Sequence, residues 1–116
     1  MEGHGASRTL RPLLRIERGR SREVVLIGEI DMSNVAGLRE ALERVAGEGP
    51  SMVIDLCAVT YLDSAGVSAL FDQAYRDLEV RVRADSAVAT VIKICGLIHV
   101  ARVDFLPAAQ PAAAAS

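Results

Sequence analysis

The sequence predicts an α/β fold, a single domain built as a small β–α superhelix on a mixed, mainly parallel sheet with an N-terminal antiparallel strand. Three observations support this prediction. Two apolar segments near the start flank a short polar turn, as in a hairpin, and the apolar pattern then alternates three times between helical and strand periods. Short connections with right-handed crossovers place successive strands side by side and parallel. The 116 residues, 51% hydrophobic and 24% charged, fit one compact domain.

The first two strands are expected at residues 13–17 and 23–30. Residues 18–22 between them have turn-like composition, which favours an antiparallel hairpin. Residues 24–27 form a continuous apolar run, which is typical of a central strand.

The first helix follows Ser33, because apolar residues then recur at spacings of three and four along one face: Val35, Leu38, Leu42 and Val45. Ser33 or Asn34 can cap its start, and Gly47 marks its end. Residues 52–56 are short and nearly all apolar, which predicts the next strand, buried within the sheet.

A second helix is expected from residue 65 to residue 78, since it carries a stripe made of Val67, Leu70, Phe71, Ala74 and Leu78. Residues 79–84 alternate charged and apolar side chains, as a strand near an edge would, with Val80 and Val82 facing the core.

Ser86 can cap a third helix, which Gly96 ends, and residues 100–105 form the last predicted strand. We expect residues 1–12 to be disordered because they are polar and contain glycine, and residues 107–116 because they are an alanine- and proline-rich tail without periodicity. The ordered domain should therefore span residues 13–106.

The faces of the sheet present a conflict. The apolar runs at residues 24–27 and 52–54 call for cover on both faces, as in a buried parallel sheet. Either helices lie on both faces, or one face is a surface for a partner.

Charge and composition restrict the function. The net charge is −2 and the two signs are interspersed, which gives no electrostatic case for binding nucleic acid or an anionic membrane. No apolar run approaches the roughly 20 residues of a membrane span, and the N-terminus lacks the apolar core of a secretory signal. We therefore expect a cytoplasmic protein whose partners are proteins.

Ser64 stands where the strand at residues 52–56 leads through a turn into the second helix. The start of a helix has unpaired N–H groups and the positive end of the helix dipole, so an anionic group such as phosphate is well received there. We predict that Ser64 is a regulatory phosphorylation site and not a nucleophile. The alternative is that Ser64 or Asp63 is only the N-cap of the helix.

Three segments together carry a family resemblance: Gly28-Glu29-Ile30-Asp31 after one strand, Val53-Ile54-Asp55-Leu56, and Asp63-Ser64-Ala65-Gly66 at the start of a helix. Over residues 13–105 the chain resembles the STAS domain, and most of all the stand-alone anti-sigma factor antagonists of bacteria. The four residues 63–66 alone are weak evidence. They become specific together with the upstream strand and turn.

The resemblance implies a transcription-regulating phosphoprotein that binds an anti-sigma factor with serine kinase activity and so frees a sigma factor. Phosphorylation of the matched serine, Ser64, ends that binding. The partner-binding residues that it implies are Asp31, Met32, Ser33, Asp63, Ser64, Ala65 and Gly66. It implies no cofactor, and we expect a monomer or weak dimer.

Other interpretations remain open. Gly66 either allows the backbone of a partner to approach closely or only permits a turn. Ser68 is a second, less favoured candidate for phosphorylation. Cys57 stands where the family usually has a small polar residue, so a redox role for this thiol is an alternative. A disulfide with Cys95 is not expected, because the two cysteines should lie at opposite ends of the sheet.

An enzyme with Ser64 or Cys57 as nucleophile lacks a nearby base, since His99 is distant and expected in a solvent-facing loop. The two cysteines have no metal-ligand spacing, so we expect no metal site. The remaining alternative is a STAS-type scaffold, or a ligand- or redox-sensing module of a larger signalling complex.

Overall fold

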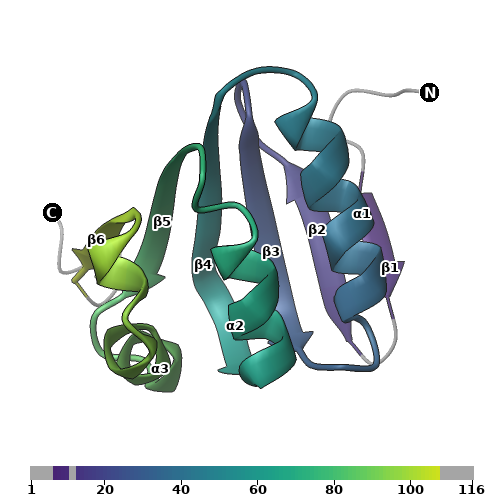
Figure 1. Cartoon of the computed structure of the whole chain (residues 1–116). Coiled ribbons are helices and arrows are strands. Elements are labelled where there is room, and N and C mark those ends of the chain that lie inside the picture. Colours follow the sequence, from purple (N-terminus) through teal and green to yellow (C-terminus); the bar gives the residue numbers. More distant parts are fainter. Residues whose placement is uncertain (1–6, 11–12, 108–116) are drawn as a thin grey trace, which may run out of the picture.

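The computed structural model describes residues 7–10 and 13–107 of the chain, and in it six strands form one sheet in sequence order. Figure 1 shows this sheet with three helices in front of it. The strands are β1 (Ser7–Leu10), β2 (Leu14–Arg18), β3 (Glu23–Ile30), β4 (Ser51–Leu62), β5 (Asp77–Arg83) and β6 (Arg102–Leu106). The helices are α1 (Val35–Ala46), α2 (Ser64–Phe71) and α3 (Ala87–Cys95), with a short 3-10 helix at Leu97–His99.

The sheet is mixed, as the sequence predicts. Strands β1, β2 and β3 pair antiparallel, whereas β3, β4, β5 and β6 pair parallel. The predicted hairpin is confirmed: the backbone N–H of Gly19 donates to the carbonyl of Glu23 at 2.9 Å between β2 and β3. Each parallel strand is reached through a helix, which is the connection that parallel neighbours require.

All three helices lie on one face of the sheet (Figure 1). The buried side chains of the strands and helices form one core on that face, with Leu26, Ile54, Leu38 and Ile92 each 0% exposed. This follows from the strand order, because right-handed crossovers between strands that add in one direction keep every helix on the same side.

The opposite face of the sheet has no helix among the described residues, which argues against helices on both faces in this part of the chain; a partner surface on that face stays a prediction. Val25, Ile27 and Val53 point to that face and are half-buried. Ion pairs stand beside them: Arg81 contacts Glu23 at 3.1 Å and Glu79 at 3.2 Å.

The strand predicted at residues 52–56 is longer than expected, since β4 continues to Leu62. The stretch taken for a turn is strand in which the pairing with β3 shifts register: Val25 pairs with Asp55, and Ile27 already with Ala58. Beyond the shift the buried residues are Val59 and Leu62, three apart, so the alternation that signals a strand is lost. Cys57 therefore lies within a strand and not after it.

The second helix is shorter than predicted. It ends at Phe71, and the N–H groups of Gln73 and Ala74 donate to residues three positions earlier, which marks tightening turns. Leu78, assigned to the helical stripe, belongs to β5 and pairs with Met52. Its helical spacing from Val67 is coincidental, because Leu78 also starts a buried period-two pattern with Val80 and Val82. Strand β5 lies between β4 and the edge strand β6, which agrees with the prediction of a strand near an edge.

The ends of the chain differ from expectation in one respect. Ser7–Leu10, within the segment expected to be disordered, forms β1 and pairs with β2, and Leu10 packs against the core. A four-residue strand at an edge is too short to show a period in the sequence. The expectations for residues 1–6, 11–12 and 108–116 fall outside the described residues.

The third helix is confirmed with its caps. The Ser86 hydroxyl oxygen accepts a hydrogen bond from the Ala89 N–H at 3.0 Å, and Gly96 ends the helix with a left-handed φ of 85°. At the first helix Asn34 holds the N-cap position, but its side chain does not cap the helix.

Candidate functional site

The predicted site lies where β3 and β4 end side by side. Ile30, the last residue of β3, pairs with Leu62, the last residue of β4. The N–H of Asp63 then donates to the carbonyl of Ile30 at 3.2 Å. The turns that follow the two strands are therefore neighbours, as expected for the carboxyl ends of parallel strands.

Asp63 connects these two turns through both carboxylate oxygens. Oδ1 accepts a hydrogen bond from the N–H of Gly66 at 3.0 Å, which caps α2. Oδ2 accepts from the N–H of Met32 at 3.2 Å, across to the turn after β3. The question of which residue caps the helix is thus answered: Asp63 is the N-cap, and Ser64 is the first helical residue.

The turn after β3 is held by its own polar side chains. The Asp31 Oδ1 accepts from the N–H of Ser33 at 2.9 Å and from its hydroxyl at 2.5 Å. Asn34, only 3% exposed, accepts from the N–H of Asp31 at 3.1 Å and donates to the carbonyl of Glu29 at 3.0 Å. Sequence reasoning considered Asn34 only as a helix cap; its buried amide instead closes the turn that presents Asp31 and Met32.

Gly28, the first residue of the matched segment 28–31, adopts a backbone that only glycine tolerates well. Its φ is +118°, and a Cβ there would lie 2.2 Å from the carbonyl oxygen of Leu13 on the neighbouring chain segment. The register between β3 and β4 also shifts at this point, between Gly28 and Glu29. The glycine therefore shapes the end of β3 that leads into the Asp31 turn.

Ser64 is exposed, and its hydroxyl forms no hydrogen bond with another described residue. In the turn after β3, Met32 is 78% exposed, and near the end of β4, Tyr61 is 51% exposed. Neither Asp31 nor Asp63 forms an ion pair within the described part of the chain. We define the switch surface as Asp31, Met32, Tyr61, Asp63 and Ser64.

Tyr61 is absent from the site residues that the sequence predicts, because the predicted strand ends at residue 56. As a strand residue paired with Glu29, it points away from the core. The buried residues nearest to it, Val59 and Leu62, are three positions apart, so a period-two pattern in the sequence does not identify Tyr61 as an outward-facing strand residue.

Gly66, counted among the partner-binding residues, is buried. A Cβ added there would lie 2.4 Å from Leu62 Cδ1 and 2.8 Å from Ile30 Cγ2, both closer than such contacts occur. The close approach that requires glycine is therefore packing of α2 onto the ends of β3 and β4. Ser33 lies exposed in the turn after β3, and Ala65 is partly buried as the second residue of α2.

The residues considered for other chemistry are separate from this surface. Burial, together with the neighbouring Asp55 carboxylate, raises the pKa of the Cys57 thiol to about 11. Such a thiol is protonated at neutral pH, which argues against the redox role. Both cysteines are free, with the Cys95 thiol donating to the carbonyl of Ile92 at 3.3 Å. His99 is exposed, in the 3-10 helix rather than an open loop.

Ser68, the less favoured candidate for phosphorylation, is exposed one turn into α2, and its hydroxyl accepts a hydrogen bond from Arg39 Nη2 at 3.2 Å.

Within residues 7–10 and 13–107, no group of three or more metal-binding side chains converges. The same residues contain no helix that is both long enough and apolar enough to cross a membrane.

The fold is that of a STAS domain. The family model for the STAS domain matches residues 16–104, and the chain therefore belongs to this family. Curated proteins contain no match to the sequence.

Among solved structures, the chain is similar to an anti-sigma factor antagonist from Mycobacterium paratuberculosis, with 26% identity, a TM-score of 0.67 and 90% of each chain covered. It also shares its fold with the anti-sigma factor antagonist SpoIIAA in its unphosphorylated form, with 13% identity and a TM-score of 0.52, over 88% of this chain and 93% of that one. The expected likeness to anti-sigma factor antagonists is thus confirmed.

Proposed function

We propose that this protein is a cytoplasmic anti-sigma factor antagonist that binds an anti-sigma factor with serine kinase activity, and that phosphorylation of Ser64 ends the binding. The observation that carries the proposal is the position of Ser64. It is an exposed first residue of α2, flanked by the capping carboxylate of Asp63 and by the turn of Asp31. The likeness to the antagonist from Mycobacterium paratuberculosis supports it.

The chemistry of the switch surface suits a protein partner. Met32 and Tyr61 offer exposed apolar area, while the carboxylates of Asp31 and Asp63 supply negative charge. Exposed aromatic and methionine side chains are enriched at protein interfaces. The partner surface should accordingly contain an apolar pocket for Met32 and Tyr61, with acidic or apolar groups, and not basic ones, opposite Ser64.

Phosphate on Ser64 changes this surface without requiring a change of fold. A phosphoserine adds about −1.5 to −2 charge. Two like unit charges about 4 Å apart repel by roughly 4 kcal/mol at an effective dielectric of about 20. Less than half of that repulsion between the phosphate and the contacting surface of the partner lowers affinity more than tenfold. The N-terminus of α2 tolerates the negative charge, so the domain remains folded while the interface is lost.

A phosphorylation assay tests the proposal directly. The protein is incubated with candidate anti-sigma factor kinases and ATP, and the added phosphate is located by mass spectrometry. We expect phosphate on Ser64, none on Ser64→Ala, and normal uptake by Ser68→Ala, which removes an exposed hydroxyl one turn along the same helix. Uptake at another residue, or none with any candidate, would favour the scaffold or sensing module.

Binding measurements test the electrostatic part separately. In calorimetry against the same kinases, Ser64→Ala should bind as the wild type does, and Ser64→Glu should bind at least about tenfold more weakly. Ser68→Glu is the matched control, since it adds the same charge to the same helix one turn further on. Equal binding by the Ser64 alanine and glutamate variants would contradict the switch.

A further inference from the structure

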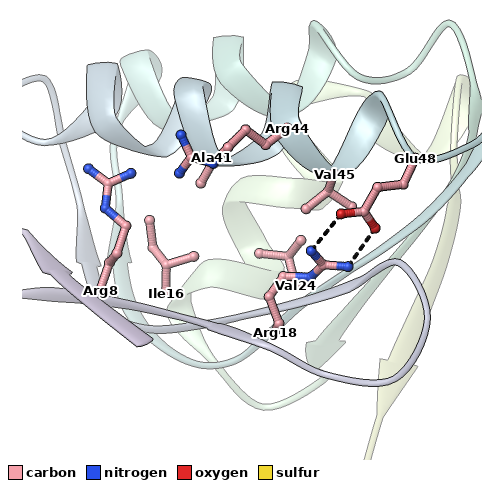
Figure 2. Close-up of a pocket in the computed structure, with 8 residues that line it drawn as sticks. All are labelled: Arg8, Ile16, Arg18, Val24, Ala41, Arg44, Val45 and Glu48. Carbon is pink, nitrogen blue, oxygen red and sulfur yellow. Dashed lines mark hydrogen bonds and ion pairs between the residues drawn. The ribbon is translucent and has the colours of Figure 1, made fainter. Parts of the chain in front are cut away.

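A second feature of the molecule lies at the far end of α1 from the switch surface. Between this helix and strands β1, β2 and β3 is a hollow of about 190 Å³ (Figure 2). Four apolar side chains and four charged ones line it: Ile16, Val24, Ala41 and Val45, and Arg8, Arg18, Arg44 and Glu48. From Val35 at the start of α1 to Arg44 the helix rises by roughly 14 Å, so the hollow is separate from the Asp31 turn.

One of its arginines, Arg18, already has its charge paired, although its Nε is buried without a hydrogen-bond partner among the described residues. Arg18 donates from Nη1 and Nη2 to the two carboxylate oxygens of Glu48, at 2.9 and 2.8 Å, and from Nη2 to the carbonyl of Ser21 at 2.7 Å. This bidentate pair raises the pKa of Arg18 and lowers the pKa of Glu48. Arg18 and Glu48 therefore cancel in charge and form a fixed wall of the hollow.

The other two arginines are not balanced. Neither Arg8 nor Arg44 forms an ion pair with another described residue. Figure 2 shows their guanidinium groups turned toward one another above Ile16, one from β1 and one from α1. Two like charges facing each other across an apolar floor repel, and an anion placed between them relieves the repulsion.

We propose that this hollow binds a small carboxylate with a compact apolar body, of the size of benzoate or hexanoate. The carboxylate lies between Arg8 and Arg44, which suit it because guanidinium groups bind carboxylates in planar, two-point geometry. The apolar body lies against the apolar lining of the hollow, of which Ile16 and Ala41 keep 5% and 6% of their surface exposed. An apolar cavity of about 150 Å³ holds benzene, so the volume fits a ring or a short chain of that size.

The size also decides against a larger occupant. Sites for drug-sized molecules measure roughly 300 to 1,000 Å³, and a peptide segment of a partner protein needs an extended groove. A carboxylate with five or six heavy atoms outside the charged group, as in hexanoate or benzoate, matches the hollow instead. For so few atoms we expect a Kd on the order of 1 mM.

Nuclear magnetic resonance on the full chain tests the site, with sodium benzoate and sodium hexanoate as probes. Both should shift the methyl signals of Ile16, Val24 and Val45. Acetate supplies the charge without the body, and hexanol the body without the charge, so each should bind about tenfold more weakly or not at all. Shifts confined to other methyl groups, or no shift with either probe at about 10 mM, would overturn the proposal.

Two variants address charge and volume separately. Arg44→Gln should weaken benzoate binding about tenfold, while Arg39→Gln, the same change five positions earlier on α1, should leave it unchanged. Ala41→Leu fills the hollow and should abolish binding, with circular dichroism to verify that the domain is folded. If Ala41→Leu does not fold, Ala41→Val replaces it. Unchanged binding in Arg44→Gln refutes the anion site, and unchanged binding in the Ala41 variant refutes its location.

Discussion

Asp63 holds the candidate site together, and its substitution gives the sharpest test of the structure. Asp63→Ala removes both acceptor oxygens, leaving the N–H of Gly66 and the N–H of Met32 without their side-chain partner. Loss of a helix cap costs about 1 kcal/mol, and loss of the second hydrogen bond costs about 1 kcal/mol more at a partly exposed position. We expect the free energy of unfolding to fall by about 2 kcal/mol.

Asp63→Asn separates the two contacts. The amide retains one acceptor oxygen, which can still cap α2, but its NH₂ group cannot accept from the N–H of Met32. The free energy of unfolding should therefore fall by about 1 kcal/mol, half the effect of alanine. In hydrogen exchange, the amide of Met32 should exchange faster in both variants, because its acceptor is lost.

Urea unfolding followed by circular dichroism measures the change in free energy, and thermal unfolding followed in the same way measures the change in Tm. For a domain of this size, about 1 kcal/mol corresponds to roughly 4 to 8 °C in Tm, so Asp63→Ala should melt about 8 to 16 °C below the wild type. Asp85→Ala is the control, since Asp85 is exposed and, within residues 7–10 and 13–107, its side chain bonds only to Arg83, a pair worth at most about 1 kcal/mol. A loss below about 0.5 kcal/mol in Asp63→Ala would refute the bridging role.

Three further predictions concern packing, reactivity and recognition. Gly66→Ala should lower the free energy of unfolding by about 1 to 3 kcal/mol in urea, because the added Cβ meets Leu62 and Ile30 in the core. Gly37→Ala should lower it less, because the atom nearest to its added Cβ is the end of the Leu10 side chain. Equal losses in the two variants would contradict the packing of Gly66. Cys57, with a pKa of about 11, should react with iodoacetamide far more slowly at pH 7.5 than glutathione does, as mass spectrometry measures, and faster with each step toward pH 11. Because the thiol pKa is higher in the folded than in the unfolded chain, its contribution to stability is present below about pH 9 and is lost as pH rises toward 11. Tyr61→Ala should leave the urea midpoint unchanged and weaken binding to the anti-sigma factor at least about tenfold, in line with an exposed aromatic anchor; unchanged affinity would exclude Tyr61 from the interface.

Much of the fold could be predicted from the sequence because its elements follow simple periods. The strand at Glu23–Ile30 has the predicted bounds, and Ser86 and Gly96 mark the ends of α3 by local hydrogen bonds and backbone conformation that depend on few residues. The parallel order of the strands followed from the alternation of helix and strand. These features are local, so local patterns report them.

The errors arose where tertiary pairing overrides the local pattern. Strand β4 continues past Leu56 because it pairs with the end of β3 through a register shift, which a single sequence does not reveal. Leu78 fits both a helical stripe and a strand, and only its pairing with Met52 decides between them. The role of Asp63 was equally hidden, since a cap within its own helix is a local pattern, but the contact with Met32 spans two turns.

The division of tasks between Asp63 and Ser64 bears on how the proposed switch can work. If the Ser64 hydroxyl capped α2, phosphorylation would remove the cap, and loss of binding would follow from local unfolding as well as from charge. Asp63 caps the helix instead, and Ser64 is exposed without a side-chain hydrogen bond to a described residue. The hydroxyl can therefore accept a phosphate at little cost to the fold, and the positive end of α2 offsets part of the added charge. An unmodified and a phosphorylated form of equal stability, differing only in the charge of the switch surface, are what a reversible binding switch needs.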